Sequence, residues 1–376
     1  MDVPARPVSP SYDLIVIGGG LVGGAVSWGA ARLGARVALL DEGDVAFRAS
    51  RGNFGLVWVQ SKGADMPPYA HWTRRSAALW PELAAALATQ TGTDVALRQI
   101  GGLHLCLSEA ELEQRAALIT RMHNDSGGIG TRIVDRAELR RMVPAIGDAV
   151  VGAAFCPVDG HANPLKLLQA LQAGLLGHGG TYLPNRHVDS ITHESGQFII
   201  QSGSERLLGA KLVIAAGLGS RTLAPLVGLD MPVKPLRGQI IVTERLRPFL
   251  DYATHAVRQT DEGSVMLGDS QEDVGFDNAT TVPVMQGIAA RNLAMFPLLK
   301  DAAIARVWGA LRVMTPDGYP IYQESQSHPG AFAATCHSGV TLAGVHAMAL
   351  APAIMAGALP PAVEAFHAAR FHVPAA

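Results

Sequence analysis

Three glycines near the start of the chain have the spacing that binds the phosphates of a dinucleotide. Gly18, Gly20 and Gly23 form the pattern G-x-G-x-x-G between an apolar run and a segment of small residues. In such a turn the first glycine allows the sharp bend, the second lets a pyrophosphate approach the backbone, and the third lets helix and strand pack closely. Leu21 and Val22 open the expected helix, whose N-terminus would face the phosphates.

A carboxylate follows at the distance that dinucleotide sites require. The second apolar run, 36–40, ends in Asp41 and Glu42, and Asp41 lies 23 positions after Gly18. A carboxylate here would bind a ribose hydroxyl. Strand, glycine turn, helix, strand and acid in this order are far more specific than the glycines alone. We therefore predict a dinucleotide site.

Arg312 is the strongest candidate for contacting a substrate, because a guanidinium can hold a carboxylate through two parallel hydrogen bonds. Its neighbours Trp308, Leu311 and Val313 are apolar, which argues against a surface position. A buried arginine needs an anionic partner. We expect Arg312 to orient the acid group of a small molecule.

The composition limits the classes of function. The chain has 376 residues, of which 48% are hydrophobic, so we expect two domains with sizeable cores. The formal net charge of -2 argues against a nucleic-acid partner. Cys106, Cys156 and Cys336 are far apart and form no C-x-x-C pattern. This argues against a disulfide framework, a zinc site or an iron–sulfur cluster, and we predict no metal.

We expect the protein to be cytoplasmic. The cysteine usage favours a reducing compartment, and the proline-containing start of the chain shows no secretory signal. The run 340–359 is long and apolar enough to cross a bilayer. However, it is mostly Ala and Gly and contains His346 and Pro352, so a buried helix is the better interpretation. At most we expect peripheral association with the inner membrane.

The order of the predicted elements indicates an α/β protein with a discontinuous second domain. A helix at 68–89 and a strand at 102–107 do not continue a simple βαβ series. Alternating segments at 236–243 and 264–268 suggest a sheet in the inserted part. We predict a Rossmann-like nucleotide-binding domain made of 1–60, 148–230 and 305–376. The predicted substrate domain, an α+β unit with a mixed or antiparallel sheet, comprises 61–147 and 231–304.

Three observations favour FAD over NAD as the dinucleotide. The glycine pattern stands at the start of the chain, and no second G-x-G-x-x-G is present for a separate nicotinamide. Ala215, Ala216 and Gly217 end a buried strand with small residues, which would leave room for the cofactor. An NAD-linked dehydrogenase is the alternative at this point.

Several motifs resemble those of the D-amino acid oxidase and glycine/sarcosine oxidase superfamily of FAD enzymes, over about 12–372. The stretch at 309–320 contains one extra residue relative to the family pattern. The motifs are S-x-x-N-x-G at 50–55, D-G-x-x-x-P at 159–164, P-x-R-G-Q at 235–239, a relative of G-x-R-P-x-T-P-D-G-x-P at 309–320, and the segment 336–342.

The resemblance implies which further residues contact FAD. The apolar helix expected after Gly339 would place its N-terminus under the flavin pyrimidine, where the reduced ring gains negative charge. Some family members tether the flavin through a cysteine close to the arginine that corresponds to Arg312. Val313 and Met314 stand there instead, so we expect non-covalent FAD. The implied contacts are Ser50, Arg51, Asn53, Phe54, Gly55, Val188, Gly309, Ser338, Gly339, Val340 and Thr341.

The resemblance also implies roles in substrate binding. Arg312 matches the family's carboxylate-binding arginine. The glycine-oxidase branch has a substrate-contacting tyrosine near position 255, and this chain has none beside it. His337 could titrate near neutrality. The weaker catalytic candidates are His255, Arg258 and His337.

The segments 47–60 and 336–341 resemble, more closely, the catalytic β subunits of heteromeric bacterial D-hydroxyproline and opine dehydrogenases. In those assemblies the β subunit holds FAD and partner subunits carry further redox groups. We therefore expect a FAD-dependent dehydrogenase that oxidises the C–N bond of a small amino or imino acid by hydride transfer to flavin N5. We expect the chain to be the catalytic β subunit of such a heteromeric complex, which passes electrons to a partner subunit or the respiratory chain. A D-amino acid, D-hydroxyproline or an opine would be the substrate. The alternatives are a self-contained oxidase that uses O2 and a non-catalytic FAD-binding subunit that relays electrons.

Overall fold

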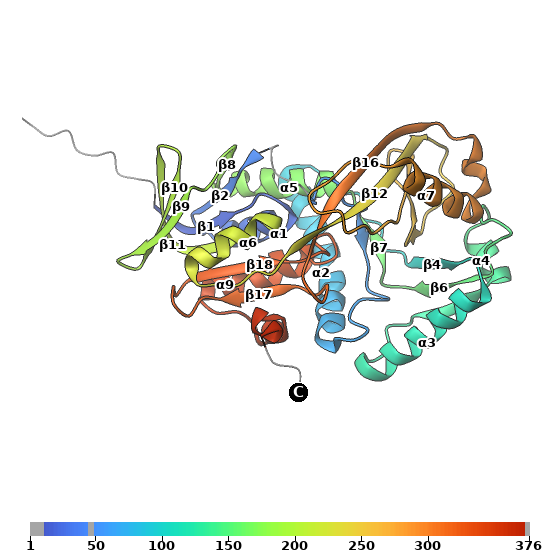
Figure 1. Ribbon diagram of the computed structural model, residues 1–376, viewed down its shortest axis with the longest axis horizontal. Helices are drawn as coiled ribbons and strands as arrows, with labels where there is room; N and C mark the ends of the chain where they lie inside the picture. The colour runs from blue at the N-terminus through green and yellow to red at the C-terminus, as the bar shows by residue number, and fades with distance from the viewer. Residues whose placement is uncertain (1–10, 44–48, 373–376) are drawn as a thin grey trace, which may run out of the picture.

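The computed structural model describes residues 11–43 and 49–372. Figure 1 shows two lobes, one built around an eight-stranded sheet and the other around two four-stranded sheets. Helices and mixed and antiparallel sheets occur together, which confirms the predicted α/β class.

The first lobe has a core of parallel strands. Residues 14–17 and 37–41 are buried, because helices pack on one face of these strands and β9, β10 and short helical turns pack on the other. Because the carboxyl ends of parallel strands meet at one edge of a sheet, the glycine turn lies beside the ends of three other strands. In spatial order the parallel strands are β18 (Ala331–Thr335), β11 (Glu205–Ile214), β1 (Ser11–Ile17), β2 (Val37–Asp41) and β8 (Thr181–Pro184).

Antiparallel strands extend this sheet. β17 (Ile321–Glu324) pairs with β18 at one edge. β10 (Gln197–Ser202) pairs with the first half of β11 and with β9 (Ser190–Glu194). β9 and β10 lie at the end of the first lobe that is remote from the second (Figure 1).

Helices cover the sheet on the side of the glycine turn. α1 (Leu21–Arg32) packs against α5 (Pro164–Gly177) and against the C-terminal helical segment. α2 (Pro67–Thr91), predicted at 68–89, packs on α5 and on that segment. The segment consists of α8 (Ala343–Val345), the π-helical η5 (His346–Leu350) and α9 (Ala351–Ala356).

The helix expected after Gly339 begins later than predicted. Leu342 N–H donates to the carbonyl oxygen of Ser338 (2.9 Å), which closes a turn, and regular helix starts at Ala343. Within the described part of the chain, no single helix is long and apolar enough to cross a membrane. The helical segments 343–356 and 361–371 reach the length and apolar character of a membrane span only when they are taken together, and the chain bends by 104° between them.

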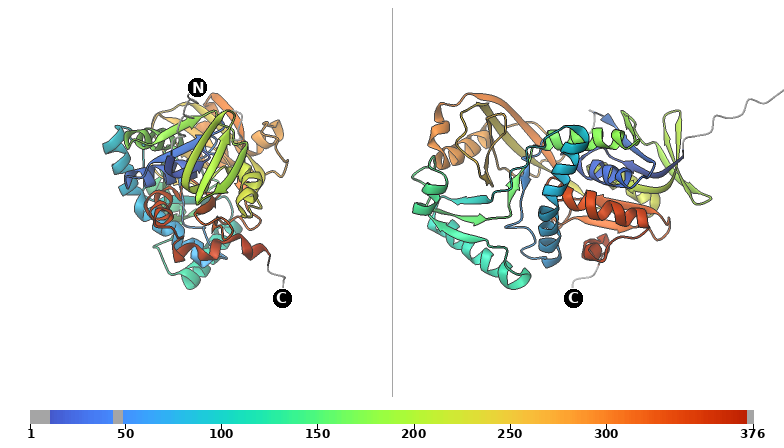
Figure 2. Two further views of the ribbon diagram at one scale, coloured as in Figure 1. Left: turned by 90° about the vertical axis from the view of Figure 1, so that its left-hand side faces the viewer. Right: turned by 180° about the vertical axis from the view of Figure 1, so that it is seen from behind.

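The second lobe contains two sheets, one of which reaches the first lobe through two long strands. β12 (Lys234–Arg245) and β16 (Ile304–Met314) pair in antiparallel fashion and run from the second lobe to the first (Figures 1 and 2). Their sheet continues through β15 (Ser264–Leu267) to β14 (Val257–Gln259). The other sheet has the order β13 (Ala253–Thr254), β4 (Gly102–Cys106), β6 (Gly152–Cys156) and β5 (Arg132–Asp135). The flanking helices are α3 (Glu109–Ser126), α4 (Arg136–Met142) and α7 (Val282–Met295).

The predicted domain boundaries stay predictions. β6 lies within the predicted nucleotide-binding segment 148–230, yet it pairs with β4 and β5 of the second lobe. β16 lies almost wholly within 305–376, yet it pairs with β12. The sheets and the predicted boundaries therefore divide the chain differently at these two strands.

A buried polar chain in the first lobe should make stability depend on pH. His346 is 0% exposed and its Nε2 lies 2.7 Å from the Tyr322 hydroxyl, which accepts a hydrogen bond from Trp72 Nε1 (3.3 Å). Burial lowers the pKa of His346 to about 3, whereas a histidine in an unfolded chain titrates near about 6.5. Only the unfolded state takes up this proton between the two values. The free energy of unfolding should therefore fall as the pH decreases from about 6.5 to about 3.

We expect His346→Gln, which removes the titration and keeps a hydrogen-bonding side chain, to reduce this slope by up to about 1.4 kcal/mol per pH unit. Urea unfolding of both proteins at about pH 7 and about pH 5 measures the difference. His178→Gln, at an exposed histidine, is the matched control and should keep the wild-type slope. An unchanged slope in His346→Gln would show that this histidine does not contribute.

Candidate functional site

Two adjoining cavities lie where the parallel strands of the first lobe end. The first cavity has a volume of about 350 Å³ and is lined by residues that follow β1, β2, β11 and β18. The second cavity, of about 210 Å³, is lined by the loop after β2, by β12 and β16, and by the turn before α8. Ala49, Asn53 and His337 line both cavities. One elongated molecule can therefore extend from the first into the second.

The glycine turn forms a wall of the first cavity where side chains do not fit. Gly18 has a φ of +110°, and a Cβ added there would lie 2.4 Å from the carbonyl oxygen of Ala215. A Cβ on Gly23 would lie 1.9 Å from the carbonyl oxygen of Gly18. These approaches require glycine at both positions. The third glycine of the pattern thus serves the packing of α1 on β1.

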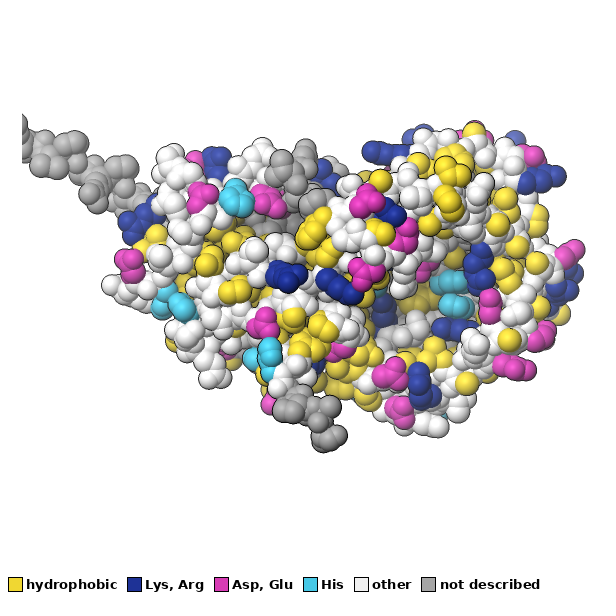
Figure 3. Space-filling view, in the orientation of Figure 1, with side chains coloured by type: hydrophobic (Ala, Val, Ile, Leu, Met, Phe, Trp, Pro, Cys, Tyr) yellow, Lys and Arg dark blue, Asp and Glu magenta, His cyan; other side chains and the backbone are white. Residues whose placement is uncertain are grey.

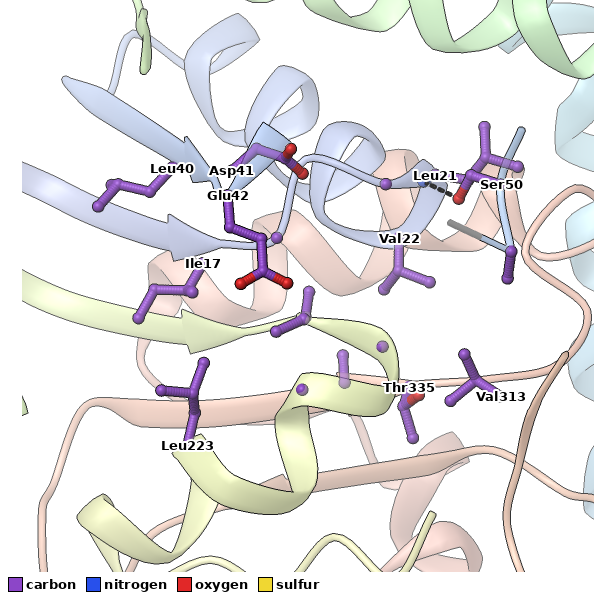
Figure 4. A pocket seen from close by; sticks show the side chains of 18 of the residues that line it. Ile17, Leu21, Val22, Leu40, Asp41, Glu42, Ser50, Leu223, Val313 and Thr335 are labelled. Carbon is purple, nitrogen blue, oxygen red and sulfur yellow. Dashed lines mark hydrogen bonds between the residues drawn. The ribbon is translucent and has the colours of Figure 1, made fainter. Parts of the chain in front are cut away.

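The N-terminus of α1 faces the first cavity through Gly20, Leu21 and Val22. Leu21 N–H donates to Ser50 Oγ (3.0 Å; Figure 4), so the loop that carries Ser50 is fastened to the start of the helix. A Cβ on Gly20 would lie 2.9 Å from the same oxygen. A helix N-terminus that lines a cavity in this way attracts the negative charge of a diphosphate.

The two acidic residues at the end of β2 make different contacts. Asp41 is 8% exposed, and its carboxylate accepts hydrogen bonds from the N–H groups of Gly19 (2.7 Å) and Gly43 (2.9 Å). Figure 4 shows Glu42 pointing to the opposite side, between the end of β1 and the chain that follows β11. Its Oε2 lies 3.2 Å from His187 Nδ1. Asp41 braces the glycine turn, and Glu42 is the better candidate for binding a ribose.

An apolar region lies next to Glu42. Figure 4 shows Ile17 and Leu223 on the same side of the first cavity as Glu42. Val188 and Leu226 also line this cavity. An apolar recess beside a carboxylate suits the base and the ribose of an adenosine group.

Most of the predicted cofactor residues line one of the two cavities. Gly23, Gly55 and Gly309 line neither. A Cβ on Gly55 would lie 2.5 Å from the carbonyl oxygen of Ala162, and one on Gly309 would lie 2.5 Å from that of Asn278, so both are packing positions. Those in the first cavity are Gly18, Gly20, Leu21, Val22, Asp41, Glu42, Ser50, Arg51, Asn53, Val188, Ala215, Ala216, Gly217 and Gly339. Those in the second are Asn53, Phe54, Ser338, Val340 and Thr341.

Arg312 lines the second cavity from β16. Its guanidinium lies over Gly238 of β12, where a Cβ would come within 2.6 Å of it. Arg312 Nη1 donates to the carbonyl oxygen of Ser270 (2.6 Å), and Nη2 forms an ion pair with Asp269 Oδ1 (2.6 Å). The anionic partner that a buried arginine requires is thus an aspartate of the same chain.

The P-x-R-G-Q motif holds the loop that carries Asp269. Arg237 is 3% exposed and forms ion pairs with Glu272 (2.7 Å) and Asp277 (2.5 Å). Gln239 Nε2 donates to Glu272 Oε1 (2.8 Å). The loop between β15 and α7 is therefore fixed to β12 at the edge of the second cavity.

The turn before α8 supports the second cavity from the first lobe. Thr341 Oγ1 accepts a hydrogen bond from Trp58 N–H (3.1 Å) and donates to the carbonyl oxygen of Leu56 (3.1 Å). These contacts hold β3 (Leu56–Val57) beside the turn. Ser338 Oγ lies 3.2 Å from His337 Nδ1. Burial and two nearby cations lower the pKa of His337 well below its ordinary value, so it does not titrate near neutrality as the sequence suggested.

The other two catalytic candidates differ in position. His255 lines the second cavity and stacks on His104, with ring centroids 3.8 Å apart. Burial lowers the pKa of His255 to about 3, so its ring is neutral at pH 7. Arg258 is 2% exposed and lines neither cavity. Its Nη2 contacts Met266 Sδ (2.8 Å), and its guanidinium packs behind Gly55, which takes it away from any substrate.

Two charged residues of the second cavity were missed from the sequence. Lys62 lies in the turn after β3, and Asp269 is the second residue after the end of β15. Lys62 is one of only five lysines and follows closely on the S-x-x-N-x-G motif, which was the available signal. No sequence signal marks Asp269 beyond its place after an alternating strand.

The remaining predictions concern two residues outside the described ranges, the binding of metals, and the cysteines. Phe47 and Arg48, part of the segment likened to β subunits, lie outside the described residues. In the described ranges no three His, Cys, Asp or Glu side chains are arranged to hold a metal ion. Cys336 lines the first cavity, and burial raises the pKa of its thiol to about 12. The non-covalent attachment of FAD stays a prediction.

Comparison with known proteins identifies relatives along almost the whole chain. The DAO family, described as FAD dependent oxidoreductase, matches residues 13–353. An opine oxidase subunit from Agrobacterium tumefaciens (strain Ach5) is 42% identical over 366 residues, which cover 97% of this chain and 99% of the relative. Glycine oxidase from Geobacillus kaustophilus (strain HTA426) is 25% identical over 342 residues, covering 88% and 90%.

Solved structures also match the fold over almost the whole chain. The crystal structure of glycine oxidase from Geobacillus kaustophilus superposes with a TM-score of 0.85 and 23% identity, covering 96% of this chain and 98% of the other. This likeness concerns the fold, whereas the family match and the relative at 42% identity concern descent. The chain belongs to the DAO family of FAD-dependent oxidoreductases.

Proposed function

We propose that this protein oxidises the C–N bond of a small amino or imino acid, with an opine as the favoured substrate. The observation that carries the proposal is the position of Arg312, which lines a cavity that adjoins the dinucleotide cavity. A relative at 42% identity is named as a subunit of opine oxidase. An arginine beside a redox cofactor provides what such a reaction asks of the protein, namely orientation of the substrate.

The residues present fit FAD. The glycine turn and the N-terminus of α1 would hold the diphosphate, and Glu42 with the apolar region beside it would hold the adenosine. The second cavity, continuous through Asn53 and His337, would take the flavin ring. When bound, FAD supplies an acceptor for two electrons and a hydrogen from a carbon that is bonded to nitrogen.

Arg312 would orient the substrate by its acid group. The side chain of Arg312 is 24% exposed and that of its partner Asp269 is 48% exposed, so Asp269 is free to turn towards solvent. A substrate carboxylate would then take its place. The exchange keeps the guanidinium paired throughout, which avoids the cost of an isolated buried charge.

The charges of the second cavity favour the neutral form of the substrate amine. His255 and His337 are uncharged at pH 7 because burial lowers the pKa of both. A protonated amine would face the positive charges of Arg312 and Lys62, which lowers its pKa. The neutral amine has the lone pair that stabilises the developing C=N bond. The apolar side chains that limit access of water are Leu56, Trp58, Ile240 and Leu311.

We also propose that the chain is the catalytic subunit of a larger dehydrogenase. Two relatives, at 42% and 41% identity, are both named as subunits of opine oxidase. A self-contained oxidase that passes electrons to O2 is the second candidate, favoured by relatives named glycine oxidase at 25% identity. The two differ in how fast the reduced protein reacts with oxygen.

Anaerobic bleaching of the flavin tests this proposal. The FAD-loaded protein is mixed with opines, D-hydroxyproline, D-amino acids and sarcosine, and loss of the visible flavin absorbance is followed. We expect at least one opine to bleach the flavin, slow recovery in air with little peroxide, and fast recovery with an artificial acceptor. If no imino or amino acid bleaches a flavin that dithionite reduces, the substrate class is wrong. Rapid peroxide formation would instead establish the self-contained oxidase.

A further inference from the structure

Lys62 is carried by a rigid turn at the second cavity. Asp159, which is 0% exposed, accepts hydrogen bonds from Val59 N–H (2.5 Å) and Gln60 Nε2 (2.9 Å). Lys62 N–H donates to the carbonyl oxygen of Val59 (2.9 Å). Gly63 has a φ of +80°, and a Cβ there would lie 2.3 Å from a backbone nitrogen of α2. These contacts fix where the side chain of Lys62 starts.

The ammonium group of Lys62 has no partner within the part of the chain that the structure describes. It forms neither a side-chain hydrogen bond nor an ion pair there. Asp269 is engaged by Arg312, and Asp159 by the backbone and Gln60. Burial lowers the pKa of Lys62 to about 8, so most molecules still carry the charge at pH 7.

Once Asp269 turns towards solvent and leaves Arg312, the second cavity presents two cations to a substrate. Its charged lining residues are Lys62, Arg312 and Asp269. Figure 3 shows basic and histidine side chains in the hollow between the two lobes. A substrate with one carboxylate would satisfy Arg312 and leave Lys62 uncompensated. A second carboxylate would satisfy both cations, and charge-assisted hydrogen bonds of this kind are the strong ones.

We propose that Lys62 is a specificity-determining residue that binds a second acid group, so that the protein selects imino acids with two carboxylates over those with one. The inference rests on the proposed function, because it concerns the substrate of that reaction. Arg312 reaches the cavity from β16 and Lys62 from the turn after β3. Two acid groups on either side of a secondary amine can thus each meet one cation. His337 lines the same cavity as both cations.

The test compares two ligands that differ in one acid group and that cannot be oxidised at a C–N bond. Thiodiacetate has two carboxylates, and (methylthio)acetate has one. Their dissociation constants are measured from the change in the visible spectrum of the FAD-loaded protein. We expect the wild type to bind thiodiacetate at least tenfold more tightly, and Lys62→Met to reduce this preference to twofold or less. Lys62→Arg should restore most of the preference, and Lys300→Met, at an exposed lysine, should keep it.

Each outcome is decisive for Lys62. A wild type without preference, or a Lys62→Met variant that retains it, overturns the inference. If Lys62→Met retains the preference but shifts the pH profile of bleaching, Lys62 accepts a proton from the amine instead. Failure of the proposed function is recognised separately, because then no opine, D-hydroxyproline, D-amino acid or sarcosine bleaches the wild-type flavin, whatever the two dissociation constants are.

Discussion

Replacing Arg312 with alanine is expected to slow substrate-driven bleaching of the flavin about a thousandfold at fixed substrate concentration, while FAD stays bound. Removing one partner of a partly buried, hydrogen-bonded charge pair costs about 2–5 kcal/mol, and each 1.4 kcal/mol is about a factor of ten. The substitution also removes the hydrogen bond to the carbonyl oxygen of Ser270 and the ion pair with Asp269. The substrate would then meet an unpaired aspartate in place of a guanidinium.

Stopped-flow absorbance under anaerobic conditions measures this effect. Arg312→Lys keeps the charge without the planar fork, so it should lose less than Arg312→Ala. Arg306→Ala is the matched control, because Arg306 lies on the same strand β16 and is exposed. The flavin of Arg306→Ala should bleach at a rate within about twofold of the wild-type rate. Wild-type bleaching in Arg312→Ala, with the FAD content unchanged, would contradict the role of Arg312.

Gly18→Ala is expected to weaken FAD binding at least a hundredfold and to give a largely colourless protein. The added Cβ would lie 2.4 Å from the carbonyl oxygen of Ala215 and 2.7 Å from the Ala216 Cα, in a backbone with φ +110°. Backbone atoms cannot yield as a flexible side chain can, so β1 and the end of β11 must separate. That movement widens the wall on which the diphosphate would lie.

Gly34→Ala separates this clash from ordinary backbone strain. Gly34 also has a positive φ, +86°, but a Cβ there would meet nothing within 4 Å. An alanine in this conformation costs about 1 kcal/mol, so the variant should lose some thermal stability and bind FAD normally. Titration of the apoprotein with FAD gives both affinities. Equal affinities of the two variants for FAD would show that Gly18 is not required for FAD binding.

The local signals in the sequence were sufficient to predict which residues line the first cavity where the parallel strands end. The glycine turn, the acids after β2 and the small residues after β11 each stand at a strand end, and parallel pairing brings strand ends together without further information. The spacing alone does not decide between Asp41 and Glu42, which both line the first cavity. Neighbouring residues at a strand end point in opposite directions, so the count of positions could not tell which carboxylate braces the glycine turn and which faces a ribose.

The substrate side depends on contacts between segments that are remote in the sequence. Lys62 and Asp269 meet at one cavity only because the turn after β3 and the loop after β15 are brought there by other parts of the chain. Gly309 carried a family motif, yet the backbone carbonyl oxygen of Asn278 lies 2.5 Å from the place that a Cβ would take there, which leaves no access to a ligand. Contacts between segments that are remote in the sequence produce no periodic pattern of residues.

The central sheet has a consequence for synthesis on the ribosome. β11 pairs with β1 on one side and, in its first half, with β10 on the other, but the end of that other edge, 212–214, waits for β18, where Leu212 meets Ala331. Until the last segment emerges, the nascent chain displays an unpaired apolar edge, which is a template for aggregation and a substrate for chaperones. A message cut short before codon 331 should therefore yield a polypeptide that quality control removes, and no flavin-binding fragment should accumulate.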